Sequence, residues 1–138
     1  MKIQVIYSSI NGKTKQIAAH FENCENILKN PNIDCNVLIV ICPTYGDEEL
    51  PLEMEDYLLN LKIKKMKFFV ICETGNYYGY DDFTFGAGII LKNYFKNLGF
   101  EEFHPMLSLD SIPKIDWDIF FKWKKELYEK IHIKSISK

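Results

Sequence analysis

Three polar segments of this sequence each follow a short apolar run, and their residue types suit a ligand with an anionic end and a flat end. The first is residues 8–14, Ser-Ser-Ile-Asn-Gly-Lys-Thr, whose hydroxyl and amide groups are neutral hydrogen-bond donors. A glycine-containing turn before a helix also presents backbone N–H groups, so this segment can hold a phosphate without a cationic clamp. It lacks the G-x-x-x-x-G-K-S/T pattern of a P-loop. A turn of this composition can also serve only to cap a helix.

The other two segments supply aromatic side chains and glycines. Residues 43–48 read Pro-Thr-Tyr-Gly-Asp-Glu, and residues 73–82 contain three tyrosines and two glycines. Exposed aromatic side chains stack on flat rings, and glycine permits backbone angles closed to other residues. The same tyrosines can instead pack on a neighbouring helix, so composition alone leaves ring binding open.

The elements that must position these segments are strands and helices in alternation. Apolar runs at residues 2–7, 37–42 and 67–72 are short and rich in β-branched or aromatic residues, which predicts strands buried on both faces of a parallel sheet. Helical spacing follows residue 14. The remaining predicted elements are helices at 52–61, 83–98 and 116–131, a last strand within 100–109 and a short edge strand near 25–28. Within the helix 83–98 we expect Ile90 to face inward, and we expect the tail from residue 134 to be frayed.

This order of elements predicts the fold class. Crossovers between parallel strands are right-handed, so the chain should form an α/β fold. We predict a doubly wound sheet of five parallel strands in the order 2-1-3-4-5, with helices on both faces. The carboxyl ends of the first, third and fourth strands then meet at one edge, which brings the three polar segments together.

Length and composition exclude several classes of protein. The 138 residues fit one domain spanning residues 1–138. There is no apolar run long enough for a bilayer and no signal-peptide pattern, so we expect a cytoplasmic protein that does not bind membranes. The four cysteines show no CxxC spacing and the three histidines are scattered, which disfavours a metal site.

The charged residues are unevenly distributed. All seventeen basic residues are lysine, and the absence of arginine disfavours nucleic-acid binding. Residues 44–61 and 68–91 contain no lysine, and we expect their carboxylates to form an acidic face around the ligand edge. These carboxylates are Asp47, Glu48, Glu49, Glu53, Glu55, Asp56, Glu73, Asp81 and Asp82.

Taken in order, the three segments resemble the FMN-binding loops of flavodoxins. Residues 9–14 are similar to the phosphate loop T/S-x-T-G-x-T, and residues 43–51, PTYGDEELP, resemble the second loop with the Gly-Asp-Glu step of short clostridial flavodoxins. Residues 74–76 resemble the start of the third loop, G-x-G-D followed by an aromatic. Asn11 and Asn76 depart from the family's threonine and aspartate. The likeness covers nearly the whole chain and includes the tryptophan-bearing last helix.

The resemblance implies a flavodoxin-like fold and an FMN cofactor, with no catalytic residue. The residues implied at the phosphate are Ser9, Ile10, Asn11, Gly12, Lys13 and Thr14. Those implied at the ring are Pro43, Thr44, Tyr45, Gly46, Asp47, Glu48, Thr74, Gly75, Asn76, Tyr78 and Tyr80. Tyr45 is expected on one face of the ring, and either Tyr78 or Tyr80 on the other.

The implied function is low-potential electron transfer. We expect a monomer that shuttles single electrons and docks basic redox partner proteins at its acidic flavin edge. The Gly-Asn step and the short segment 23–36 also resemble flavodoxin-like activators of manganese ribonucleotide reductases, which is the alternative function. A flavin-free interaction module remains open. A receiver-type signalling domain is disfavoured because the first and third strands lack the acids that it needs.

Overall fold

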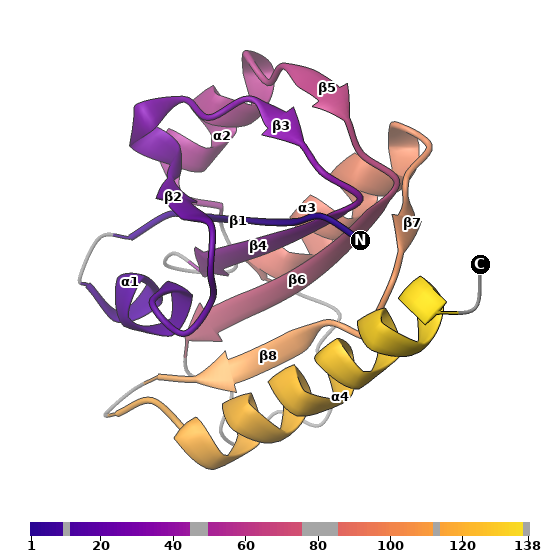
Figure 1. Ribbon diagram of the computed structural model, residues 1–138. Coiled ribbons are helices and arrows are strands. Elements are labelled where there is room, and N and C mark those ends of the chain that lie inside the picture. The colour runs from indigo at the N-terminus through magenta and orange to yellow at the C-terminus, as the bar shows by residue number, and fades with distance from the viewer. Residues whose placement is uncertain (10–11, 45–49, 76–85, 112–113, 137–138) are drawn as a thin grey trace.

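A six-stranded parallel sheet forms the centre of the computed structural model, which describes residues 1–9, 12–44, 50–75, 86–111 and 114–136. Its strands lie in the order β2-β1-β4-β6, with β7 and β8 both paired to the outer edge of β6 (Figure 1). The strands are β1 (Ile3–Tyr7), β2 (Cys24–Asn26), β4 (Val37–Pro43), β6 (Phe68–Gly75), β7 (Glu101–Glu102) and β8 (Leu107–Asp110). The predicted order 2-1-3-4-5 is confirmed, with β7 and β8 together in the place of the fifth strand.

Helices cover both faces of the sheet (Figure 1). One face carries α1 (Lys13–Ala18) and α4 (Trp117–Ile136), and the other carries α2 (Leu52–Leu59) and α3 (Ala87–Asn97). Successive side chains of a strand point to opposite faces, so Ile39 packs in the first core and Val40 in the second. The predicted doubly wound α/β fold is confirmed.

The two central strands are apolar because they are covered on both sides. Every side chain from Val37 to Cys42 is fully buried, as is typical of a parallel sheet between helical layers. β4 pairs with β1 on one side and with β6 on the other, and Pro43 lies opposite Thr74 at its end. This register places the predicted second and third segments next to each other.

The last strand is interrupted, which no local pattern in the sequence predicts. β7 pairs with Phe68 and Phe69, and β8 pairs with residues 72–75 further along β6. Pro105 lies between the two short strands and has no N–H group to donate to a ladder. Its carbonyl oxygen instead accepts a hydrogen bond of 2.9 Å from Trp123 Nε1 of α4.

Several predicted boundaries were wrong. β6 continues to Gly75, three residues beyond the predicted end, and α2 ends at Leu59. α4 continues to Ile136 rather than fraying from residue 134. Ile90 is 42% exposed and does not face the core, because its side of α3 is turned to solvent.

A second, two-stranded parallel sheet of β3 (Ile33–Asp34) and β5 (Ile63–Lys65) was not predicted. The predicted short edge strand is β2, and the 3-10 helix η1 (Ile27–Lys29) follows it. Gln4 of β1 links the two sheets, since its amide donates to Asn32 O and accepts from Asp34 N, both at 2.9 Å. Contacts of this kind join distant residues and leave no local pattern in the sequence.

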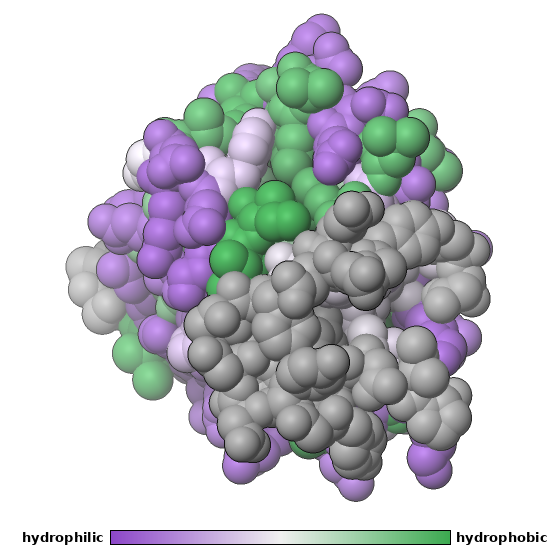
Figure 2. Space-filling model, turned by 180° about the vertical axis from the view of Figure 1, so that it is seen from behind, coloured by the Kyte–Doolittle hydropathy of each residue, from purple (hydrophilic) through white to green (hydrophobic). Residues whose placement is uncertain are grey.

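The surface carries both hydrophobic and hydrophilic residues. On the face turned away from the viewer in Figure 1, hydrophobic residues reach the surface between hydrophilic ones (Figure 2). No helix in the described part of the chain is long and apolar enough to cross a bilayer.

The burial of the cysteines predicts their reactivity. Cys35, Cys42 and Cys72 are fully buried, whereas Cys24 is half-buried. Burial raises the pKa of the Cys35 thiol to about 11 and raises the pKa values of Cys42 and Cys72 well above the ordinary value, which disfavours the reactive thiolate.

We expect a chromogenic disulfide reagent to label one thiol of the native protein and all four after denaturation. A Cys24→Ser variant should lose the native reaction, and a second fast thiol would contradict the burial pattern.

Candidate functional site

The carboxyl ends of β1, β4, β6 and β8 lie at one edge of the sheet and bring the predicted segments together. Ser8 N donates to Ile41 O at 3.1 Å, and Thr44 N donates to Thr74 O at 2.8 Å. Ser111 N donates to Gly75 O at 2.9 Å. These bonds join segments that are far apart in the sequence, so the edge is a product of the fold.

The structure describes about half of the predicted site residues. Ser9, Gly12, Lys13, Thr14, Pro43, Thr44, Thr74 and Gly75 lie at this edge. Ile10, Asn11, Tyr45, Gly46, Asp47, Glu48, Asn76, Tyr78 and Tyr80 lie outside the described residues.

The first segment turns at Gly12, which has a φ of 84°. This left-handed conformation favours glycine, and it allows Gly12 N to donate to Ser9 Oγ at 3.2 Å. A Cβ atom built on Gly12 would meet no atom within 4 Å, so the described part of the turn has open space beside it. The Ser9 hydroxyl accepts the Gly12 bond, and a hydroxyl in that position can also donate one.

Thr14 and Lys13 fix this turn to the rest of the fold. Thr14 is buried, and its hydroxyl donates to Ser8 O at 2.5 Å. The Thr14 side chain therefore stabilises the turn from the buried side, and its hydroxyl hydrogen is not directed to solvent. Lys13 Nζ donates to Ser111 O, which places a cation between the first segment and the residues that follow β8.

Thr44 links the second segment to the third. Its hydroxyl accepts a hydrogen bond of 3.2 Å from Ala87 N at the start of α3, and it donates to Glu73 Oε1 at 3.3 Å. Thr44 directly precedes residues 45–49, and α3 begins directly after Gly86. The described residues that border both tyrosine-containing segments are therefore held together.

One carboxylate of the predicted acidic face, Glu73, is placed differently from that prediction. Glu73 is fully buried and contributes nothing to a surface. Glu53 of α2 accepts a hydrogen bond of 2.8 Å from Ser8 Oγ, beside the first segment. The predicted acidic face was therefore wrong for Glu73. Glu73 directly follows the apolar run 67–72, and such a position does not distinguish an exposed acid from a buried one that is hydrogen-bonded.

These two carboxylates also influence a neighbouring thiol. Burial is the main reason that the pKa of Cys42 is raised, and the negative charges of Glu53 and Glu73 raise it further. The Cys42 thiol therefore stays neutral and packs in the second core as a small apolar group.

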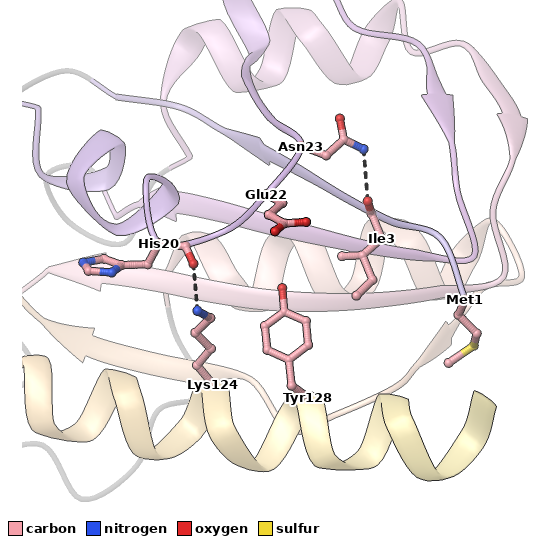
Figure 3. A pocket seen from close by; sticks show the side chains of 7 residues that line it. All are labelled: Met1, Ile3, His20, Glu22, Asn23, Lys124 and Tyr128. Carbon is pink, nitrogen blue, oxygen red and sulfur yellow. Dashed lines mark hydrogen bonds between the residues drawn. The ribbon is translucent and has the colours of Figure 1, made fainter. Parts of the chain in front are cut away.

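A separate hollow of about 500 Å³ lies between α4 and the amino ends of β1 and β2 (Figure 3). Two of its polar side chains are used within the protein, since Lys124 Nζ donates to His20 O at 2.7 Å and Asn23 Nδ2 donates to Ile3 O at 3.0 Å. Open α/β sheets bind ligands at the carboxyl ends of their strands. The carboxyl edge, and not this hollow, is therefore the candidate site.

Solved flavodoxin structures match this chain over nearly its whole length. The oxidised flavodoxin 1 of Bacillus cereus matches with a TM-score of 0.72 and 17% identity, over 96% of this chain and 98% of that one. A flavodoxin of Streptococcus pneumoniae matches with a TM-score of 0.70 and 20% identity, over 96% and 98% of the two chains. The chain has the flavodoxin fold.

A flavodoxin of Pseudomonas aeruginosa matches with a TM-score of 0.67 and 20% identity, over 94% of this chain and 95% of that one. No protein-family model matches the sequence, and no curated protein matches it. The sequence-based resemblance to flavodoxins is thus confirmed for the fold, although the identities are low. The flavodoxin fold accounts for the strand order and for the carboxyl edge at which the three segments meet.

Proposed function

We propose that this protein binds FMN and carries single electrons between redox partners, as a flavodoxin does. The observation that carries the proposal is the meeting of the three segments at the carboxyl edge of a flavodoxin fold. Ser8 N of the first segment donates to Ile41 O of β4 at 3.1 Å, and Thr44 N of the second segment donates to Thr74 O of the third at 2.8 Å. An edge built in this way suits a ligand that spans from the Ser9–Thr14 turn to the tyrosine-containing segments.

The donor set at this edge fits FMN. The first segment offers the Ser9 hydroxyl and the backbone around Gly12, with open space beside the turn and the Lys13 ammonium nearby. These groups suit a phosphate. Glu53 is an unfavourable neighbour for an anion, but its carboxylate is engaged by Ser8 Oγ on the inner side of the turn.

The proposed roles of the chain's own residues rest on the resemblance of the three segments to flavodoxin loops and on the described ends of these segments. Residues 9–14 hold the phosphate, Thr44 and residues 45–48 border one side of the ring, and residues 74–80 border the other. Bound FMN supplies the one-electron chemistry, while the protein supplies binding, orientation and the electrostatic environment. Acidic groups near the ring oppose added negative charge and thereby lower the reduction potential.

We further propose that the protein works in the cytoplasm as a monomer. The acidic residues of segments 45–49 and 81–82 would attract a basic partner protein to the flavin edge, in a weak encounter that is sensitive to salt. Raising the ionic strength should therefore slow electron transfer to such a partner.

An FMN titration of the apoprotein tests the proposed function. We expect one FMN per chain, observed as quenching of flavin fluorescence. Riboflavin is the matched control because it has the ring but no phosphate, and it should bind at least about 100-fold more weakly if several charge-assisted hydrogen bonds hold the phosphate. Absence of FMN binding would refute the proposal. Equal affinity for both flavins would refute the phosphate role of residues 9–14.

A reductive titration of the loaded protein then separates carrier from activator. Two well-separated one-electron potentials, with a low second potential, are expected for the carrier. Two closely spaced potentials would favour the ribonucleotide reductase activator instead.

A further inference from the structure

The carboxylate of Glu73 is fully buried where three elements meet beside the proposed flavin site. Its Oε1 atom accepts hydrogen bonds from Gly88 N at 3.0 Å and from the Thr44 hydroxyl at 3.3 Å. Its Oε2 atom accepts from the Ser108 hydroxyl at 2.5 Å. Burying a carboxylate is costly unless its oxygens are hydrogen-bonded, and here both oxygens are. Glu73 therefore connects the end of β4, the start of α3 and β8.

The negative charge of this group is not cancelled by a cation among the described residues. Between described residues, ion pairs join Lys2 to Asp34 and Lys92 to Glu102, and neither pair includes Glu73. The partners of Glu73 are N–H and O–H dipoles, and the positive end of the α3 dipole adds to them. A charge held in this way in a low-dielectric interior still acts on its surroundings.

Two glycines next to Glu73, Gly86 and Gly88, have no room for a side chain of their own. A Cβ atom on Gly86 would lie 2.6 Å from Glu73 Oε1, and one on Gly88 would lie 2.9 Å from Glu73 Cδ. Gly86 also has a φ of 105°, which favours glycine. The two glycines allow the start of α3 to approach the carboxylate closely, so the contact is part of how α3 docks.

The contacts of Glu73 hold the borders of both segments proposed to flank the ring. Thr44 directly precedes residues 45–49, while Gly75 and Gly86 border residues 76–85. Glu73 lies two residues before Gly75 and binds Gly88 just after Gly86. Fixing the ends of a segment reduces the conformational entropy that it loses when it binds a ligand.

We propose that Glu73 is a positioning residue of the flavin site, which fixes the borders of both ring-side segments and whose buried charge disfavours full reduction of the cofactor. This inference rests on the proposed function. The second electron leaves more negative charge on FMN, so a fixed anion weakens binding of the fully reduced cofactor most. The ratio of the protein's affinities for two redox states of FMN sets the reduction potential between those two states.

The Glu73→Gln variant tests the charge. The amide has the same shape, its oxygen can still accept from Gly88 and Thr44, and its NH₂ group can donate to Ser108. We expect the second one-electron potential to rise by about 59 mV, which is a tenfold change in that affinity ratio. The affinity for oxidised FMN should change less than about threefold. Glu101→Gln, the same change at an exposed acid of β7, is the matched control and should leave the potential unchanged.

The Glu73→Ala and Ser108→Ala variants test the positioning role. Glu73→Ala removes all three hydrogen bonds, and we expect at least about a tenfold loss of affinity for oxidised FMN. Ser108→Ala removes one bond and keeps the charge, so it should weaken FMN binding by about threefold and leave the second potential near that of the wild type. If Glu73→Ala does not fold, Ser108→Ala alone tests the positioning role. Urea unfolding of each apoprotein measures stability separately.

The outcomes distinguish this inference from the proposed function. If the wild type binds FMN and Glu73→Gln matches Glu101→Gln in its second potential, the role of the charge is refuted while the proposed function stands. A loss of apoprotein stability in the alanine variants with unchanged FMN affinity would show that Glu73 is only structural. If the wild type does not bind FMN, both proposals fail.

Discussion

The Gly88→Ala variant is expected to be less stable than the wild type by about 2 kcal/mol, the range found for overpacked cores. This is opposite to the usual effect, because alanine stabilises a helix by about 1 kcal/mol relative to glycine. The added Cβ atom would lie 2.9 Å from Glu73 Cδ and 2.3 Å from Met106 Sδ. Met106 has a flexible side chain that can move, but Glu73 is held by three hydrogen bonds.

Urea unfolding measures this change through the denaturation midpoint. Asn93→Ala on the exposed side of the same helix is the control, and it should be neutral or slightly stabilising. Combining Gly88→Ala with Met106→Ala should restore only part of the loss if Glu73 is the fixed obstacle. A Gly88→Ala variant as stable as Asn93→Ala would contradict the close packing of α3 on Glu73.

Tyr45→Ala is expected to weaken FMN binding by about 30-fold, or about 2 kcal/mol. This figure combines the apolar area that a stacked tyrosine buries with about 1 kcal/mol for the stacking itself. Tyr45 follows Thr44, whose backbone and side chain are both fixed at the carboxyl edge. Tyr45→Phe keeps the ring and should bind FMN within about threefold of the wild type.

The same measurement on Tyr78→Ala and Tyr80→Ala identifies the second aromatic contact. The variant that removes the stacking residue should lose affinity as Tyr45→Ala does, and the other should stay near the wild type. If all three alanine variants bind FMN as tightly as the wild type, the tyrosines do not border the ring. These residues lie outside the described part of the chain, so the sequence alone is the basis for naming them.

The parts of the fold that follow from local patterns were predictable. The run 37–42 predicts a strand buried on both faces, and the structure buries every one of its side chains. Alternation of strands and helices, together with right-handed crossovers, then leaves few arrangements, and the observed strand order is the predicted one. The meeting of the three polar segments at one edge follows from that order.

Contacts between distant residues were not predictable from these patterns. The split of the last strand depends on Pro105 and on Trp123 of α4, and the β3–β5 pair depends on Gln4. A hydrogen bond between residues far apart in the chain leaves no periodic signal in either segment. Local patterns therefore predicted the order of the main elements better than the number of strands or the ends of each element.

Glu73 shows most clearly which features follow from the sequence and which depend on the tertiary structure. The sequence by itself determined that an acid follows an apolar run near the ligand edge, because residue types and their spacing are local properties. Only the tertiary structure decided that this acid is buried, since its three donors come from Thr44, Gly88 and Ser108. The physical reason is that a carboxylate can leave water only where the folded chain brings enough donors together.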